Sequence, residues 1–280
     1  MIFYALHLPN IEQDRVELLK AACAKLKIKF RTLDPFSFDF SRPSPVQKGD
    51  ILYRVSRGKL LRALEDYVLR DGVTTFYKNV SSRVSDPFVL EKNAVATPKS
   101  ILCLTSRRSL LTGYVKQLGG FPIVIKALGG TRGLGVMKID SFTALFGIVD
   151  YLLAQNKFIS LRQFVPVKSS ARLIVLGKNV IGSIEYQAKG DDFRTNASAV
   201  PVVVKKQYSR EIQGLAVRAT QAMGLEFGGV DVLIDGKKYY VSEVNFPCNF
   251  VRAHKVLKKD IALEMVRYLQ AKSEGDIAAK

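Results

Sequence analysis

Asp231, Glu243 and Asn245 are the residues whose types and spacing best suit metal-assisted chemistry. Asp231 stands in Gly-Val-Asp, and the other two stand in Glu-Val-Asn. Carboxylate and amide oxygens are ligands that Mg²⁺ accepts in sites where it is shared with phosphates. The sequence therefore predicts a metal site at these three residues, here called the acidic trio, provided that their side chains share one face.

A β-hairpin would bring the acidic trio together. Two runs rich in β-branched and aromatic residues, 230–234 and 239–245, flank a short polar connection, which is typical of a hairpin. If Asp235 pairs with Tyr239 across a three-residue loop, Asp231 faces Glu243, and Asn245 follows on the same side. A four-residue loop would put the two carboxylates on opposite faces, and the sequence alone leaves both registers open.

A glycine-rich segment offers a second chemical feature. Residues 121–126 predict a strand that ends in Lys126, and Gly-Gly-Thr-Arg-Gly-Leu-Gly follows at 129–135. Glycines let the backbone approach phosphates closely, and a lysine supplies a point charge. The alternative is a flexible hairpin turn. A second expected strand, 134–139, follows the loop, so neither a Walker A loop nor a Rossmann turn fits.

The order of the motifs supports a family resemblance. Asp-Phe-Arg-Thr-Asn at 192–196 lies between the glycine-rich loop and the acidic trio. This order resembles the ATP-grasp superfamily, specifically the RimK-type ligases that add glutamate to a carboxyl terminus. The resemblance runs from about Arg83 to Leu269. It implies an α/β (α+β) fold: a small N-terminal α/β domain, 1–83, and two ATP-clamping α+β lobes, 84–163 and 164–280.

The resemblance also implies roles for individual residues. The acidic trio would hold Mg²⁺, with Mn²⁺ as an alternative, and Lys126 and Arg194 would be catalytic. Arg54 and Arg172 would lie toward the substrate, although either could instead be structural or solvated. The residues expected to contact ATP are Arg83, Lys126, Gly130, Thr131, Gly133, Gln163, Phe164, Ser170, Arg194 and Asn196.

Several positions depart from the family pattern. Gln163 stands where the family often has glutamate, Ser170 replaces the aspartate of Asp-Ile-Arg, and Arg83 replaces a lysine. Phe-Pro-Cys-Asn at 246–249 stands where the family usually has Ser-Pro-Gly. The resemblance therefore does not carry the substrate across to this chain.

The elements that must position these residues follow from the hydrophobic pattern. Segments 2–8, 12–27 and 28–33 predict a β-α-β opening with parallel strands. Segments 173–176 and 179–186 predict a hairpin, and 209–223 predicts a helix that leads into the hairpin of the trio. We expect His254 to lie in a solvated basic loop.

Composition limits the remaining possibilities. The chain has 280 residues, is 48% hydrophobic and has no long apolar run, so we expect a globular cytoplasmic protein without a membrane segment. Its 3 cysteines are scattered and only 2 histidines occur, which argues against zinc binding and against cysteine or serine catalysis. A lone cysteine such as Cys248 is more often a small apolar filler than a nucleophile.

The formal net charge of +18 predicts a positive surface potential. Such a surface attracts phosphates, acidic peptides or nucleic acid, or it is simply solvated. We expect an acidic peptide, amino acid or protein tail as substrate. The aromatic stacking motifs of common RNA-binding modules are absent, which disfavours nucleic acid. A homo-oligomer stays open.

These features predict an ATP-dependent carboxylate–amine ligase that forms an amide bond through an acyl phosphate. One alternative is a small-molecule kinase of the same fold, which would transfer the phosphoryl group to a hydroxyl. Another is a basic nucleic-acid-binding protein with a decayed ATP site, and steep salt dependence of oligonucleotide binding would favour it.

Overall fold

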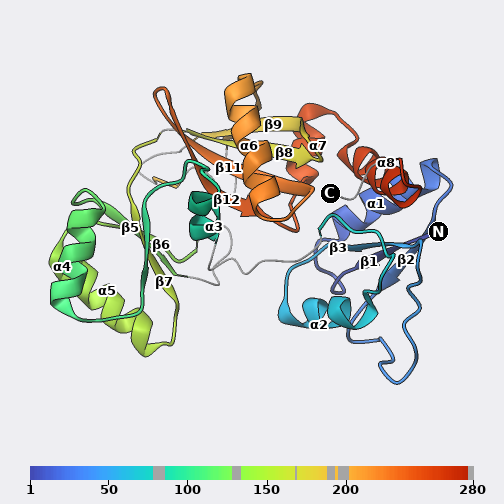
Figure 1. The fold of residues 1–280 in the computed structure, drawn as a ribbon, viewed down its shortest axis with the longest axis horizontal. Helices are drawn as coiled ribbons and strands as arrows, with labels where there is room; N and C mark the ends of the chain where they lie inside the picture. The colour runs from blue at the N-terminus through green and yellow to red at the C-terminus, as the bar shows by residue number, and fades with distance from the viewer. Residues whose placement is uncertain (78–85, 128–133, 168, 188–192, 195–201, 277–280) are drawn as a thin grey trace.

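The computed structural model describes residues 1–77, 86–127, 134–167, 169–187, 193–194 and 202–276. Their strands form three sheets that follow one another along the chain, and the third lies between the other two (Figure 1). Each sheet falls within one of the three ranges expected from the sequence. The domain boundaries at 83 and 163 remain predictions.

The first sheet is parallel, in the order β2-β1-β3. Strand β1 alternates: Phe3 and Ala5 face a core that includes α1, whereas Tyr4 and Leu6 face a core that includes α2. The parallel β-α-β opening is thereby confirmed. Its elements are β1 (Ile2–Leu6), α1 (Gln13–Lys25), β2 (Lys29–Leu33), β3 (Ile51–Arg54) and α2 (Lys59–Val68).

The second sheet is antiparallel, in the order β4-β7-β5-β6. Helices α4 and α5 share a core with Ile123, Ile125 and Leu161 on one face. By alternation, Lys126 and Arg162 lie on the opposite face. After α3 (Asp86–Lys92), the elements are β4 (Ser100–Cys103), α4 (Arg108–Gln117), β5 (Ile123–Ala127), β6 (Val136–Ile139), α5 (Phe142–Ala154) and β7 (Ile159–Gln163).

The third sheet is antiparallel, in the order β10-β9-β8-β11-β12, and contains the hairpins expected at 173–186 and at the trio. Its elements are β8 (Ser169–Leu176), β9 (Asn179–Gln187), β10 (Val202–Lys205), α6 (Arg210–Ala222), β11 (Phe227–Asp235), β12 (Lys238–Asn245), α7 (Val251–Leu257) and α8 (Ile261–Ser273). The prediction of a basic loop around His254 is wrong, because these residues form α7, in which Val251 and Ala253 are buried.

The first and third sheets share one hydrophobic core. Tyr53 of β3 packs edge-on against Phe227 of β11, with ring centroids 6.3 Å apart. At the periphery, Lys25 of α1 forms a 2.6 Å ion pair with Asp260, which caps α8. In the described part of the chain, no helix is long and apolar enough to cross a bilayer.

Candidate active site

The hairpin of β11 and β12 brings the acidic trio together by a route that the sequence did not predict. Asp235 pairs with Lys238 rather than with Tyr239, so the turn has two residues instead of three. Continued without interruption, this register would place Ser242 opposite Asp231. The register shifts between Asp231 and Val232, and Asp231 faces Glu243 as a result.

Ser242 is the extra residue of this β-bulge, because Val232 pairs with Val241 and Asp231 with Glu243. A contact from the second sheet supports the bulge: Nη1 of Arg162 donates to the carbonyl oxygen of Ser242 at 2.9 Å. Arg162 is only 8% exposed, so this hydrogen bond is shielded from water. The bulge and its support place both carboxylates on one face.

The members of the trio are in direct contact with one another. Nδ2 of Asn245 donates to Oδ2 of Asp231 at 3.2 Å and to Oε1 of Glu243 at 3.0 Å. Asp231 and Asn245 are buried, at 4% and 6% exposure, and Glu243 is half-buried. Two carboxylates and the Asn245 amide therefore converge in a largely desolvated place, and the carboxylate oxygens are of the kind that a hard cation prefers.

Each member of the trio contacts one basic side chain, and the three basic residues come from the regions of three different sheets. Arg172 of β8 pairs with both oxygens of Asp231, at 2.7 and 2.6 Å. Nζ of Lys126, at the end of β5, lies 3.0 Å from Oε2 of Glu243. Arg57, in the connection after β3, donates to Oδ1 of Asn245 at 2.6 Å. The trio thus lies where the three sheets meet.

Burial and pairing act in opposite directions on Asp231. Burial raises the pKa of its carboxyl above the ordinary value, against the effect of Arg172. Burial also opposes the charge on Arg172, but contact with Asp231 raises the pKa of the guanidinium well above its ordinary value. The two short contacts of a planar guanidinium with one carboxylate are the geometry of an ion pair.

The pairing of both carboxylates bears on how a metal would enter. Arg172 and Lys126 already balance the charges of Asp231 and Glu243. A divalent cation by itself would add charge to a neutralised cluster, whereas one that arrives with phosphates brings its own anions. The donor set therefore fits Mg²⁺ bound together with a nucleotide better than it fits a free metal ion.

Comparison with known proteins gives this site its family context. Residues 83–269, more than half of the chain, match the model of the RimK-like ATP-grasp domain. The chain belongs to the RimK-like ATP-grasp family. The resemblance inferred from the motifs is thereby confirmed.

Curated relatives of this RimK-like chain are distant. A probable alpha-L-glutamate ligase of Klebsiella pneumoniae is 29% identical over 168 residues, which is 59% of this chain and 56% of the relative. A ribosomal protein bS6–L-glutamate ligase of Salmonella paratyphi B is 28% identical over the same shares. The chain therefore spans about half the length of the curated relatives that it matches.

Solved structures confirm the ATP-grasp fold over nearly the whole chain. The ATP-grasp ligase PsnB, in complex with a minimal precursor, Mg and ADP, superposes with a TM-score of 0.74 at 17% identity, covering 97% of both chains. D-alanine–D-alanine ligase from Bacillus anthracis superposes with a TM-score of 0.70 at 13% identity, covering 99% of this chain and 100% of the other. At these identities the likeness concerns the fold alone.

The structure does not place Arg54 where a substrate could reach it. Its side chain is 3% exposed and forms a 2.9 Å ion pair with Glu65, which also accepts from the hydroxyl of Tyr77. A buried charge of this kind is held by its partner. This pairing favours the structural alternative for Arg54, whose substrate role stays a prediction, and the basic residue of this segment that reaches the trio is Arg57.

The other described residues expected at the site lie around it. Gln163 ends β7, and the ring of Phe164 packs against Phe193 with centroids 6.1 Å apart. Nζ of Lys138 lies 4.7 Å from the centre of the Phe164 ring. Ser170 is buried on β8, two residues before Arg172 and on the same face. Arg194 is half-buried. Their nucleotide contacts remain predictions.

Some expected ligands lie outside the described residues: Arg83, Gly130, Thr131, Gly133 and Asn196. The residues on both sides of 128–133 are described. The backbone N–H of Ala127 donates to the carbonyl oxygen of Gly135 at 2.8 Å, so β5 and β6 form a closed antiparallel pair. Gly135 has a φ of +81°, a conformation that favours glycine.

The segment that departs from the family pattern after Asn245 is buried at residues 246–248, while Asn249 is exposed. The ring of Phe246 packs against Tyr53 and Tyr77, with centroids 6.0 and 5.2 Å away. Cys248 is fully buried, and burial raises the pKa of its thiol to about 11, which keeps it protonated at neutral pH. This segment joins the third sheet to the first.

Two residues that the structure places at the site, Arg57 and Arg162, were not expected there. Arg57 follows β3 and Arg162 precedes the Gln163-Phe164 pair, and neither residue stands in a motif of its own. Both act on the hairpin from distant parts of the chain, through Asn245 and Ser242. Sequence patterns that describe neighbouring residues carry no signal for such contacts.

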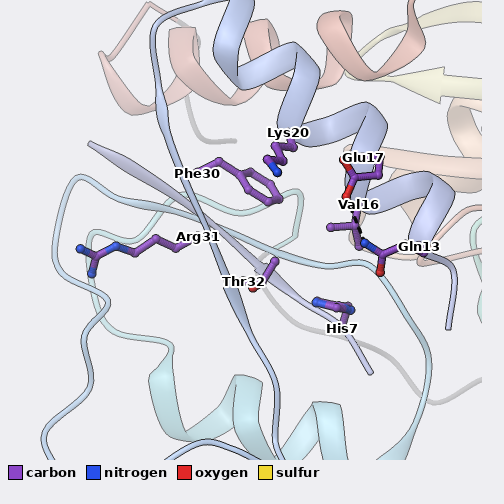
Figure 2. Close-up of a pocket in the computed structure, with 8 residues that line it drawn as sticks. All are labelled: His7, Gln13, Val16, Glu17, Lys20, Phe30, Arg31 and Thr32. Atoms are coloured by element: carbon purple, nitrogen blue, oxygen red, sulfur yellow. Dashed lines mark hydrogen bonds between the residues drawn. The ribbon is translucent and has the colours of Figure 1, made fainter. Parts of the chain in front are cut away.

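A hollow of about 550 Å³ lies apart from the trio, between α1 and the edge strand β2 (Figure 2). His7 and Thr32 stand at one end of it and Lys20 and Phe30 at the other, while the Arg31 side chain points away from the group. Glu17 accepts a hydrogen bond from Gln13 at 3.0 Å. This open rim of long polar side chains lacks the converging groups of the trio.

Proposed function

We propose that this protein is an ATP-dependent carboxylate–amine ligase that forms an amide bond on an acidic peptide, amino acid or protein tail. The observation that carries the proposal is the pairing of Lys126 with Glu243. The ammonium group of Lys126, on the strand that leads into the glycine-rich loop, thereby contacts one of the predicted metal ligands. Family membership and the ATP-grasp fold support the same activity.

The proposed reaction has two steps. A substrate carboxylate attacks the γ-phosphorus of ATP, which forms an acyl phosphate and releases ADP. An amine then attacks the acyl carbon, the C–N bond forms, inorganic phosphate leaves, and the amine gives up a proton to the solvent. This chemistry requires positioning and charge neutralisation more than a reactive side chain, which suits a chain with only 2 histidines.

The residues of the chain would divide this work. Asp231, Glu243 and Asn245 would hold Mg²⁺, which supplies charge neutralisation at the phosphates. Lys126 would turn from Glu243 to a phosphate oxygen when nucleotide enters, because both are anions within reach of one flexible side chain. Arg172, held by Asp231 at two points, would keep that carboxylate oriented. Arg194 would neutralise charge near the acyl phosphate.

We infer the nature of the acceptor from the net charge of this chain and from the names of its relatives. The chain carries +18, far more than a nucleotide requires, and such a field concentrates acidic molecules near the site. One relative is named for ligation of glutamate to a ribosomal protein, and PsnB was solved with a precursor peptide. We therefore propose an acidic peptide segment as acceptor, encountered in the cytoplasm. Manganese would serve in place of magnesium.

A screen of amino acids and acidic peptides tests the proposed function. Each candidate is incubated with ATP, Mg²⁺ and the protein, ADP is measured, and products are analysed by mass spectrometry. A ligase gives ADP together with a product that has gained one amide linkage. ADP with a stable phosphorylated hydroxyl would indicate the kinase alternative. Binding of oligonucleotides without ATP turnover would contradict both enzyme readings.

A further inference from the structure

The orientation of the Asn245 amide is fixed by charged neighbours on both sides. Its Nδ2 donates to Asp231 and Glu243, and its Oδ1 accepts from Arg57 at 2.6 Å. The reverse orientation would set the amide oxygen against two carboxylates and the amide N–H groups against a guanidinium, which only donates. The neighbours thus leave one favourable orientation.

This orientation is the wrong one for binding a cation. A hard cation is bound by the oxygen of an asparagine, because the amide nitrogen offers no lone pair. The side of Asn245 that faces the two carboxylates presents its nitrogen. For Asn245 to join Asp231 and Glu243 as a ligand, the amide must turn over, which breaks its hydrogen bond with Arg57.

We infer that Arg57 is a positioning residue that couples metal binding to acceptor binding through Asn245. In the described arrangement Arg57 holds the amide turned away from the metal position. When the amide turns, its N–H groups face the guanidinium, so Arg57 loses this hydrogen bond, and a new acceptor in its place favours the turned state. A carboxylate of the acidic acceptor is such a partner, since it takes a guanidinium in two parallel hydrogen bonds.

The location of Arg57 suits this exchange. It follows β3, at the carboxyl end of the parallel first sheet, which is where open α/β sheets bind ligands. It is half-buried, so it is reachable from solvent while it contacts Asn245. Coupling between two sites is reciprocal. An acceptor carboxylate that occupies Arg57 must therefore raise the affinity for the metal by the same factor by which the metal raises the affinity for the acceptor.

The inference rests on the proposed metal site, and Mn²⁺ with a non-hydrolysable ATP analogue tests it directly. Free Mn²⁺ is measured by electron paramagnetic resonance, because carboxylate and carbonyl ligands suit this ion. Arg57→Ala is expected to bind Mn²⁺ about 5-fold or more tightly than the original protein, the lower end of typical coupling between sites. Arg62→Ala, which removes an exposed arginine of α2, is expected to have no effect.

Loss of a positive charge could raise metal affinity without any movement of the amide, so the comparison is repeated in an Asn245→Ala background. There the gain from Arg57→Ala should shrink, because the amide that links the two is gone. A gain of the same size in both backgrounds would overturn the inference, as would an unchanged or weaker affinity in Arg57→Ala alone.

A tetraglutamate peptide provides the second arm. It should tighten Mn²⁺ binding in the original protein and in Arg62→Ala, but not in Arg57→Ala. Equal tightening in Arg57→Ala would overturn the inference. If the original protein binds no Mn²⁺ with the analogue present, the proposed metal site and this inference both fall. If it binds Mn²⁺ and only the Arg57 effects are missing, the proposed function stands without the coupling.

Discussion

Lys126 links the glycine-rich segment, which we propose binds the ATP phosphates, to the acidic trio, which we propose binds Mg²⁺. It is the penultimate residue of β5, shortly before the glycine-rich segment, and its Nζ contacts Oε2 of Glu243 at 3.0 Å. Both side chains are about a quarter exposed, at 24% and 27%, so the pair is accessible to a nucleotide. At the scale of single residues, the proposed function therefore depends on whether Lys126 can change partners.

Lys126→Ala is expected to weaken binding of Mg²⁺ with a non-hydrolysable ATP analogue by about 1.5–3 kcal/mol, the size of a hydrogen bond to a charged group. Titration calorimetry measures this change. Lys116→Ala, at an exposed position on α4, is the matched control and should leave the affinity as it is. Unaltered nucleotide affinity and turnover in Lys126→Ala would refute the phosphate role.

Glu243→Gln keeps the size of the side chain but removes its charge. Mg²⁺-dependent ADP formation should fall by about 100-fold or more, because changes even to partners of metal ligands cost 10–100-fold. Glu226→Gln is a matched control, since Glu226 forms a 2.6 Å ion pair with Lys272 away from the trio. Equal losses of turnover in the two variants would show that the effect comes from lost stability.

At the scale of elements, the site depends on how β11 fits against the segment that follows β12. Gly229 lies on β11 opposite Asn245, and a Cβ added there would come within 2.5 Å of Sγ of Cys248. The absence of a side chain at Gly229 thus lets the buried segment after Asn245 pass close to the strand. Asn245 lies on β12 between the bulge at Ser242 and the buried segment that contains Cys248.

Gly229→Ala should destabilise the protein by about 1–3 kcal/mol, because it overfills a packed site. Cys248→Ala removes the sulfur that the new methyl group would meet, and the remaining Cβ lies at an ordinary 3.6 Å. The double variant should therefore lose less than the sum of the two single variants, as measured by denaturant unfolding. Strictly additive losses would contradict this account of the packing.

At the scale of the whole molecule, the three sheets are joined in two different ways. The first and third share a hydrophobic core, to which Phe246 and Tyr53 contribute. The second sheet has a core of its own and contacts β12 through polar groups, among them Arg162 with Ser242 and Lys126 with Glu243. The trio thus lies beside an apolar junction on one side and a polar one on the other.

The net charge of +18 leads to a prediction at this scale. The field of the molecule should steer an acidic acceptor toward the trio, and salt should screen it, with a Debye length of about 8 Å at physiological ionic strength. The kcat/KM for an acidic acceptor should fall as NaCl rises, while KM for ATP, set by short contacts, changes less. Equal rates with neutral and acidic acceptors at all salt concentrations would remove the acidic acceptor from the proposal.

The sequence by itself determined which residues form the trio, that the loop after Lys126 joins two strands, and which family the chain belongs to. These features are local: Gly-Val-Asp, Glu-Val-Asn and the glycine run are read along a few residues. The parallel opening was likewise predicted, because two short apolar segments, 2–8 and 28–33, flank a segment with helical spacing, 12–27.

Only the tertiary structure decided how the trio is assembled and held. A two-residue turn followed by a bulge at Ser242 gives the same facing pair as the three-residue loop expected from the sequence, and residue types alone do not distinguish them. Arg57, Lys126 and Arg172 reach the trio from three sheet regions that lie far apart along the chain. Such contacts depend on how the sheets pack, which is why the contact of Arg57 with Asn245 has no signal in the sequence.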